Sequence, residues 1–587
     1  MAKRISALVA NCSSGLVMHS VTLIFALVDL SFAVELMRVD EVRPGMRGVG
    51  KSVFVGNKVE EFAVEIIDVI HKVSPRGDLI LGRLSGAGLE KSGVVAGMSG
   101  SPVYIDGKLI GAVAYAWGFA KEPIAGITPI TEMTRIWQGE EKSKAKRSRP
   151  LVPKGSRALR TALAPLLVPV AISGFNRSLA DLVTGPFAEL GLVPIPGGSS
   201  SSSSTSEDTA ALVPGGAVGV GLVTGDVRFS AIGTITHREG DRLLAFGHPL
   251  LLAGPVELPM VGGKIHTVVP TLDVSFKIFS PTAELGVITQ DRWPGISGRI
   301  GPQAPMIPVT VRLKSPTTQD TFHFRVADYE ALVPLLTSAA LANVVFQTEG
   351  AENEMTLASR LRLWTGPGEH PATIELAHIF AGPDPAQGLF QRTRQELAVL
   401  FENQFQAPDI ARMEFELDFS PGRELRFLIS AQADRSEVRP GETVNLLLRL
   451  EDWRGRRADS LITLLIPKTV PAGPLHLVIA QRDSLMALET ARAPGRLRPR
   501  SFQGLIQLLE RTGRENELVI TGYCRKPGMT LEEKELPALP PFLKAVLAGS
   551  KGNIPLEPTA SSPVLEQVVS FTTFISGVAE LDLEVKP

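Results

Sequence analysis

The sequence predicts a mainly β protein with two barrel-like halves and a further β-rich region at its C-terminal end. Two blocks, residues 34–138 and 212–320, are dense in short runs of Val, Ile and Leu that turn residues separate. The blocks are similar in size and style, as two barrel halves would be. The chain also holds 55 glycines and 44 prolines among 587 residues, which suits frequent tight connections.

The composition narrows the classes of function. Hydrophobic residues make up 44% and charged residues 21%, which excludes a mostly disordered chain. The formal net charge of −1 gives no overall field that would attract nucleic acid or an anionic membrane. The basic stretch 139–157 lacks interleaved aromatic residues, so nucleic-acid binding is not predicted. Neither a metal-binding motif nor a phosphate-binding loop occurs in the sequence, and no metal or other cofactor is expected.

The first 33 residues have the pattern of an export signal. Two positive charges lie within Met1–Arg4, an uncharged run with one histidine extends from Ile5 to Val28, and Ser31-Phe32-Ala33 supplies small residues for cleavage. The expected location is therefore the periplasm, the cell envelope or the medium. The alternative is an uncleaved membrane anchor, because the run is long enough to span a bilayer. After cleavage Cys524 would be the only cysteine, which excludes an intrachain disulfide.

The rest of the chain divides into three expected segments. Residues 139–211 are predicted to be a linker that contains a helix and a serine-rich loop. Residues 321–410 are predicted to be a mixed α/β extension with a helix from 322 to 347, which is rich in Ala and Leu over Ala331–Val345. Residues 411–587 are predicted to form an Ig-like β-sandwich with some helix.

The sharpest motif is Gly97-Met98-Ser99-Gly100-Ser101-Pro102, which directly precedes a hairpin predicted around Asp106-Gly107. A serine between glycines allows a sharp turn, so that its hydroxyl projects and successive N–H groups converge, as an oxyanion requires. We expect the N–H groups of Gly97 and Ser99 to be these donors. A strand follows the motif instead of a helix, which disfavours an α/β-hydrolase. The motif suits a chymotrypsin-like double β-barrel, and a plain Gly/Ser turn is the alternative.

A serine nucleophile needs a base, and His248 is the strongest of the nine histidines. It lies in Gly247-His248-Pro249 at the end of a predicted strand. The proline restricts His248 to extended conformations, which would hold the imidazole in place. The alternative is a structural histidine in a turn.

Three stretches of the sequence resemble the SpoIVB-type serine peptidases, a family of sporulation signalling proteases. They are the nucleophile region (Gly97–Pro102 with Lys108–Val113), the catalytic-histidine region (Gly233–His248) and the hairpin that follows it (Gly286–Gly298). Together they cover about a third of the chain. The resemblance implies a serine endopeptidase of chymotrypsin-like plan, with Ser99 as nucleophile and His248 as base.

Two departures of the sequence from the family pattern bear directly on the site. The serine block precedes the histidine block here, the reverse of the family order, and such a circular permutation is tolerable where the termini lie close together. The family's acidic residue aligns near Ser85, where no carboxylate is present. Asp78 is the nearest acid upstream and is our candidate for the residue that orients the histidine. A turn or salt-bridged aspartate is the alternative.

Two functions follow. The first is an exported serine endopeptidase that hydrolyses a protein or peptide substrate through Ser99 and His248, with Asp78 as the acid. The second is a non-catalytic binding or scaffold protein of the cell envelope, with a degenerate peptidase fold and a protein partner on its C-terminal region.

Overall fold

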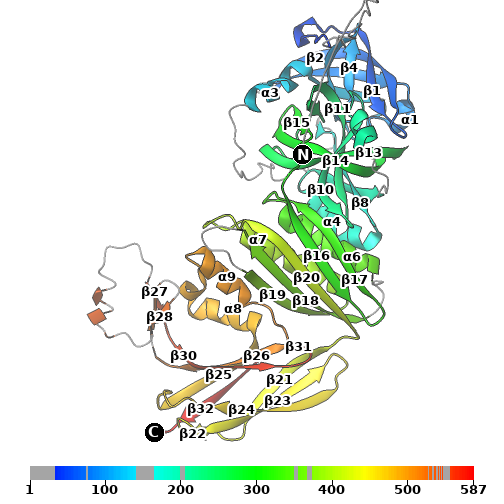
Figure 1. Ribbon diagram of the computed structural model, residues 1–587. Helices are drawn as coiled ribbons and strands as arrows, with labels where there is room; N and C mark the ends of the chain where they lie inside the picture. The colour runs from blue at the N-terminus through cyan, green and yellow to red at the C-terminus, as the bar shows by residue number, and fades with distance from the viewer. Residues whose placement is uncertain are drawn as a thin grey trace, which may run out of the picture.

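The computed structural model describes residues 34–74, 77–140, 164–198, 205–348, 354–366, 373–526, 528–531, 534–536, 540, 542–543, 545–546 and 556–587. The predicted export signal, residues 1–33, lies outside the described residues, and so do residues 141–163 of the predicted linker. The molecule is mainly β, as predicted, and elongated: the two barrels lie at one end and the C-terminal sandwich at the other (Figure 1). Within the described ranges, none of the helices has the length and apolar character needed to cross a membrane.

The first block forms a closed six-stranded barrel. Its strands are β1 (Arg47–Val53), β2 (Val59–Ser74), β3 (Gly77–Ser85), β4 (Pro102–Ile105), β5 (Lys108–Ala116) and β6 (Ile124–Pro129). Their order is β4-β1-β2-β3-β6-β5, and the pairing of β4 with β5 closes the ring. Asp106 (φ 49°) and Gly107 (φ 79°) both have positive φ at the β4–β5 turn, as the predicted type I′ hairpin requires. Four short helices flank the barrel: η1 (Val39–Glu41), α1 (Leu89–Ser92), α2 (Ile130–Met133) and α3 (Arg135–Glu140).

The second block forms a second closed ring of six strands. These are β10 (Ala217–Gly225), β11 (Phe229–Glu239), β12 (Arg242–Ala245), β13 (Gly254–Val269), β14 (Phe276–Arg292) and β15 (Gly295–Ile300). Neighbours pair in the order β10-β13-β14-β15-β12-β11, and a further β10–β11 pairing closes the ring. The predicted double barrel is thus confirmed.

The segment predicted as a linker contributes more structure than expected. Its described elements are β7 (Ala164–Pro165), β8 (Val168–Ser173), α4 (Arg177–Ala188), β9 (Leu192–Gly197) and α5 (Thr205–Ala210). The expected helix is present as α4, but β8 also pairs with β11 and β9, which extends the sheet of the second barrel. The reason is burial: Val168, Val170 and Ile172 on β8 belong to the largest apolar core.

A mixed α/β unit continues the same sheet away from the barrel. Its elements are β16 (Met306–Lys314), β17 (Gln319–Ala327), α6 (Val333–Thr348), β18 (Met355–Thr365), β19 (Thr373–Ala381), α7 (Pro385–Phe401) and β20 (Ile410–Pro421). The strand β17 joins the unit to β10 of the second barrel. The helix α6 is apolar on all sides and packs against α7 within the largest core. It covers most of the helix expected over 322–347, but residues 322–327 belong to β17 instead, where Phe324 and Val326 alternate into the core.

The C-terminal region is a two-sheet sandwich, as predicted, and begins at residue 425. One sheet contains β21 (Leu425–Ala433), β23 (Thr443–Asp452), β24 (Arg457–Leu465) and β31 (Phe574–Ser576). The other contains β22 (Glu437–Val438), β25 (Gly473–Gln481), β26 (Glu517–Cys524), β30 (Ser562–Ser570) and β32 (Val578–Val585). The two sheets share one apolar core, which includes Leu446, Leu448, Ile479 and Ile520.

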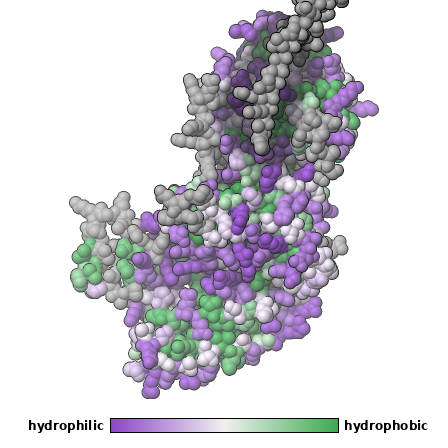
Figure 2. Space-filling model, viewed as in Figure 1, coloured by the Kyte–Doolittle hydropathy of each residue, from purple (hydrophilic) through white to green (hydrophobic). Residues whose placement is uncertain are grey.

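A helical insertion and a small sheet accompany the sandwich. The insertion comprises α8 (Arg482–Arg492), η2 (Pro494–Leu497) and α9 (Phe502–Glu510), and the small sheet comprises β27 (Gly528–Leu531), β28 (Lys534–Leu536) and β29 (Leu556–Thr559). The helix α9 packs on α7 and β19, so it ties the sandwich to the α/β unit. Apolar surface is visible at the sandwich end of the molecule in Figure 2, and Phe427, Ile429, Leu461 and Leu465 are exposed there. Partner binding through this region stays a prediction.

Candidate active site

The Ser99 loop connects α1 to β4 in the first barrel and depends on its glycines. Gly97 has φ +94° and Gly100 has φ +95°, in the left-handed region that favours glycine. A Cβ atom on Gly100 would lie 2.0 Å from the carbonyl oxygen of Thr234 on β11. Only glycine therefore lets this loop lie directly against the second barrel.

The second barrel holds the carbonyl groups of this loop. The backbone N–H of Thr234 donates to Ser99 O at 2.8 Å, and Thr234 Oγ1 donates to Gly97 O at 3.1 Å. Thr236 Oγ1 donates to Gly100 O at 2.8 Å. By contrast, the N–H groups of Gly97 and Ser99 have no acceptor among the residues that the structure describes. These are the two N–H groups predicted from the sequence to hold an oxyanion.

The His248 segment follows β12 and packs onto the first barrel in turn. Phe246 (φ 69°) and Gly247 (φ 71°) make the sharp turn that leads to the histidine. Thr128 Oγ1 on β6 donates to Gly247 O at 2.6 Å. A positive φ is costly for a phenylalanine, and such strain is found at functional sites.

The ring of His248 is oriented by the main chain. Its Nδ1 atom lies 2.8 Å from the carbonyl oxygen of Pro249. Because a carbonyl oxygen only accepts, Nδ1 carries the proton and Nε2 presents its lone pair. Burial lowers the pKa of His248 to about 4, against the effect of this hydrogen bond. The imidazole is therefore neutral at pH 7, the form that a general base requires.

The structure brings the segments of Ser99 and His248 into contact without a hydrogen bond between the two side chains. Ser99 is 0% exposed and His248 is 1% exposed, and both Ser99 Oγ and His248 Nε2 are buried without a hydrogen-bond partner. A Cβ built on Gly100 would lie 2.5 Å from the backbone nitrogen of Phe246, so the two turns touch. Burying two unsatisfied polar atoms on touching turns is costly, so each of them needs an explanation.

Asp78 lies elsewhere on the first barrel, beside the β2–β3 turn. Its Oδ1 accepts from the backbone N–H of Lys72 at 2.8 Å, and its Oδ2 lies 3.3 Å from Nδ1 of the exposed His71. The carboxylate is not bonded to His248, whose Nδ1 is taken by Pro249. The structure therefore brings together Ser99, His248 and Gly97 but leaves Asp78 apart from them.

Sequence reasoning missed Asp291, which fixes the loop after His248. Its carboxylate accepts from the backbone N–H groups of Leu250 (2.8 Å), Leu251 (2.7 Å) and Ala253 (3.1 Å). Burial raises the pKa of Asp291 to about 6, although these hydrogen bonds act in the opposite direction. One sequence signal could have found it. Asp291 is the one carboxylate in the stretch Gly286–Gly298 that resembles the family, and most of the strand that carries it is buried.

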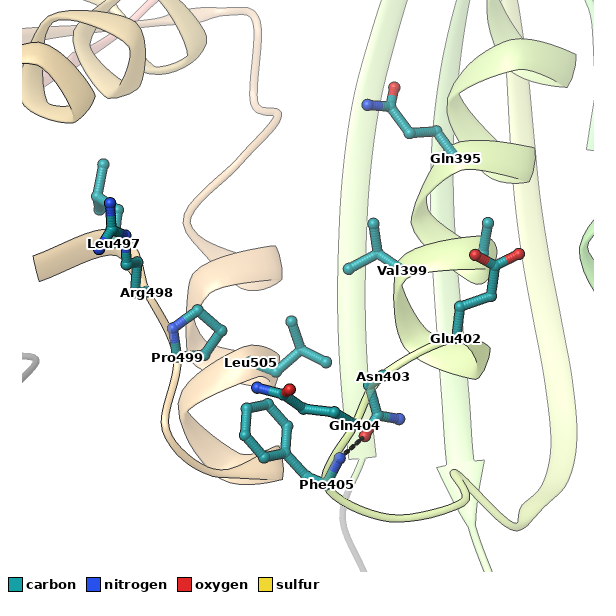
Figure 3. A pocket seen from close by; sticks show the side chains of 11 residues that line it. Gln395, Val399, Glu402, Asn403, Gln404, Phe405, Leu497, Arg498, Pro499 and Leu505 are labelled. Carbon is teal, nitrogen blue, oxygen red and sulfur yellow. Dashed lines mark hydrogen bonds between the residues drawn. The ribbon is translucent and has the colours of Figure 1, made fainter. Parts of the chain in front are cut away.

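An open cavity of about 620 Å³ lies far along the chain from these residues, between α7 and the insertion (Figure 3). Val399, Phe405 and Leu505 face it, together with polar side chains such as Gln395 and Glu402. Asn403 closes one turn at its rim by accepting from the N–H of Phe405 at 2.8 Å. None of the residues that line it belongs to the Ser99 or His248 turns.

In the described ranges, no three His, Cys, Asp or Glu side chains form a group that could hold a metal ion.

Comparison with known families agrees with the serine motif. The family model described as SpoIVB peptidase S55 matches residues 10–133. This part of the chain is therefore similar to the SpoIVB peptidase S55 family. The S55 segment contains the whole first barrel and Ser99, whereas His248 and Asp291 lie beyond it. No curated protein and no solved structure matches the chain.

Proposed function

We propose that the chain is an exported serine endopeptidase in which Ser99 attacks a peptide carbonyl and His248 accepts the serine proton. One observation carries the proposal: Ser99 Oγ and His248 Nε2 are buried and unpartnered on two turns in direct contact, one from each barrel. The S55 family match to the serine-bearing barrel supports the reaction class.

The reaction follows the serine-peptidase scheme. His248 Nε2 takes the proton from Ser99 Oγ as the oxygen bonds to the substrate carbonyl carbon, and later gives it to the leaving amine. The N–H groups of Gly97 and Ser99 receive the developing oxyanion, each contributing about 3 kcal/mol when preorganised. Water then hydrolyses the acyl-enzyme, again with His248 as the base.

Two rearrangements precede this chemistry. Ser99 Oγ has to come within hydrogen-bond reach of His248 Nε2, and catalytic hydrogen bonds are often long before substrate binds. The buried turns must also open to a polypeptide, since neither side chain is exposed. The substrate is a protein or peptide, and the N-terminal pattern would deliver the enzyme outside the cytoplasm.

The competing function is a non-catalytic binding or scaffold protein of the cell envelope. Two observations favour it. Ser99 Oγ and His248 Nε2 are not hydrogen-bonded to each other, and a main-chain carbonyl orients His248 where a triad has a carboxylate. The two functions differ in one property, the reactivity of Ser99.

Fluorophosphonate labelling separates them. We expect wild type to label at Ser99, as mapped by mass spectrometry, and both Ser99→Ala and His248→Ala to lose the label and any self-cleavage. Ser460→Ala, in the sandwich, is the matched control and should label like wild type. A folded wild type that does not label, or a Ser99→Ala variant that does, would refute the proposal.

A further inference from the structure

A buried lysine from the second barrel reaches into the first. Lys277, near the start of β14, is 1% exposed, and its Nζ donates to Ser52 Oγ on β1 at 2.9 Å. The ammonium lies 5.6 Å from the ring centroid of Phe54. No carboxylate pairs with it in the part of the chain that the structure describes. Burial lowers the pKa of Lys277 to about 7, so its place in this core is costly.

The contact with Ser52 continues to the Ser99 loop. Ser52 Oγ and Ser101 Oγ are hydrogen-bonded at 3.0 Å, and Ser101 Oγ donates to the carbonyl oxygen of Met98 at 2.6 Å. The backbone N–H of Ser101 donates to the same oxygen at 3.0 Å. A continuous network therefore runs from the lysine to the Met98 carbonyl, and such networks are cooperative inside proteins.

The oxygen at the end of this network belongs to the Met98–Ser99 peptide group. In a trans peptide the C=O and N–H bonds point in opposite directions, and the described chain has no cis peptide bonds. Fixing the Met98 oxygen toward Ser101 therefore aims the Ser99 N–H the other way. That N–H has no acceptor among the described residues and is one of the two proposed oxyanion donors.

The backbone of Lys277 supports the same loop one residue earlier. Its N–H donates to Ala96 O at 3.2 Å, and the N–H of Ala96 donates to Ser275 O at 2.7 Å. The side chain then passes Gly97, where a Cβ atom would lie 3.4 Å from Lys277 Cδ. Lys277 thus contacts the loop at its entry and reaches its centre through the two serines.

We propose that Lys277 is a positioning residue of the oxyanion hole, which acts through Ser52 and Ser101 on the Met98–Ser99 peptide group. This inference rests on the proposed function, because an oxyanion hole has meaning only if Ser99 acylates. A methionine of similar length would fill this core without the cost of burying an amine. The lysine is therefore explained by its hydrogen bond to Ser52, which through Ser101 holds the Met98–Ser99 peptide group.

The test compares acylation by p-nitrophenyl acetate and by its thionoacetate analogue, with Ser99→Ala as the blank. A sulfur in place of the carbonyl oxygen is a poor acceptor for N–H donors, so an oxyanion hole favours the oxygen ester. We expect Lys277→Met to acylate about 10- to 100-fold more slowly with the oxygen ester, since losing one donor costs about 100- to 1,000-fold. The rate with the thiono ester should change much less, so the ratio of the two rates falls.

Two further variants complete the test. Ser52→Ala removes the middle of the network with a small change in volume and should lower the same ratio, even where Lys277→Met fails to fold. Lys264→Met, on the neighbouring strand β13 with an exposed side chain, is the matched control and should keep the wild-type ratio. A wild-type ratio in Lys277→Met or in Ser52→Ala overturns the inference while the proposed function stands. A wild type that never acylates at Ser99 overturns both.

Discussion

The imidazole of His248 donates from Nδ1 to the carbonyl oxygen of Pro249, the next residue in the chain, at 2.8 Å. In a Ser-His-Asp triad a buried carboxylate occupies this position and stabilises the imidazolium that forms. A peptide carbonyl fixes the tautomer equally well but carries only a partial charge. In the proposed mechanism the Pro249 carbonyl therefore orients His248 but stabilises its charged form less than a carboxylate would.

The first prediction concerns Asp78, which the chain order suggested as the acid. Its carboxylate accepts a hydrogen bond from the backbone N–H of Lys72 and lies beside His71, away from His248. Asp78→Asn should therefore leave the rate of Ser99 labelling within about twofold of wild type. Removing a true triad acid lowers the rate about 10⁴-fold. Fluorophosphonate labelling under identical conditions measures the difference. A loss of that size would show that Asp78 moves to the histidine in the active state.

The second prediction is a pH profile. Because burial lowers the pKa of His248 to about 4, the free enzyme should keep its base neutral well below the ordinary histidine value of about 6.5. The labelling rate should then stay near its neutral-pH value down to roughly pH 5. A rate that falls by half near pH 6.5 would contradict the buried, neutral base.

The same shift affects stability with a definite sign. A histidine whose pKa is lowered on folding stabilises the native state above its unfolded pKa, near 6.5, and loses that contribution as the pH falls toward 4. Replacing His248 with alanine should therefore flatten the stability of the protein over this interval. Urea unfolding at pH 7 and pH 5 measures the effect.

Much of the fold was accessible from local sequence. Asp106-Gly107 predicted its hairpin because a type I′ turn needs positive φ at both residues, which this pair tolerates. The two β-dense blocks correspond to the two closed rings. Gly97 and Gly100 marked the Ser99 turn for the same conformational reason.

The parts that escaped prediction depend on contacts between distant residues. The strand β8 looked like linker because it is short and lies among prolines, and its partner β11 begins more than 50 residues later. Asp78 is the acid nearest to Ser85 on its N-terminal side, whereas Asp291 reaches the His248 loop from about 40 residues away along the chain. The role of Lys277 is less visible still, since Ser52 lies on a strand of the other barrel.

The third prediction concerns Asp291. Its carboxylate is the acceptor for the N–H groups of Leu250, Leu251 and Ala253, so Asp291→Ala removes an acceptor from three buried donors. At about 1–3 kcal/mol for each unsatisfied group, the free energy of unfolding should fall by about 3 kcal/mol or more. Guanidinium unfolding checks this value. Asp241→Ala, at an exposed aspartate between β11 and β12, is the control and should change little.

The fourth prediction contrasts two glycines of the first barrel. Both Gly100 (φ +95°) and Gly107 (φ +79°) lie in the left-handed region, but a Cβ on Gly107 meets open space. Gly107→Ala should therefore cost only the conformational strain, about 1–2 kcal/mol. In Gly100→Ala the new Cβ would lie 2.0 Å from Thr234 O, so the loop must leave β11. Thermal unfolding should show the larger loss in Gly100→Ala, together with loss of Ser99 labelling; equal losses would mean that the loop is not held as described.

The last prediction concerns the junction between the α/β unit and the sandwich. His378 on β19 is buried between Glu396 on α7, at 2.8 Å, and Glu515, which precedes β26, at 2.9 Å. Burial alone would lower the pKa of His378, but the hydrogen bonds and charges of the two carboxylates outweigh it and raise the pKa to about 9. The charged histidine therefore binds the two parts of the molecule together at neutral pH.

The sign of this contribution follows from linkage. Because the folded pKa lies above the unfolded value near 6.5, the contribution is complete below pH 6.5 and is lost as the pH rises toward 9. His378→Gln should remove up to about 3 kcal/mol of unfolding free energy at pH 6 and much less at pH 9, at about 1.4 kcal/mol for each pH unit. Denaturant unfolding of wild type and variant at both pH values measures this difference. His476→Gln, which removes a partly exposed histidine beside Asp582, is the control and should show a small change at either pH. An equal loss in His378→Gln at pH 6 and pH 9 would mean that His378 contributes by packing and not by charge.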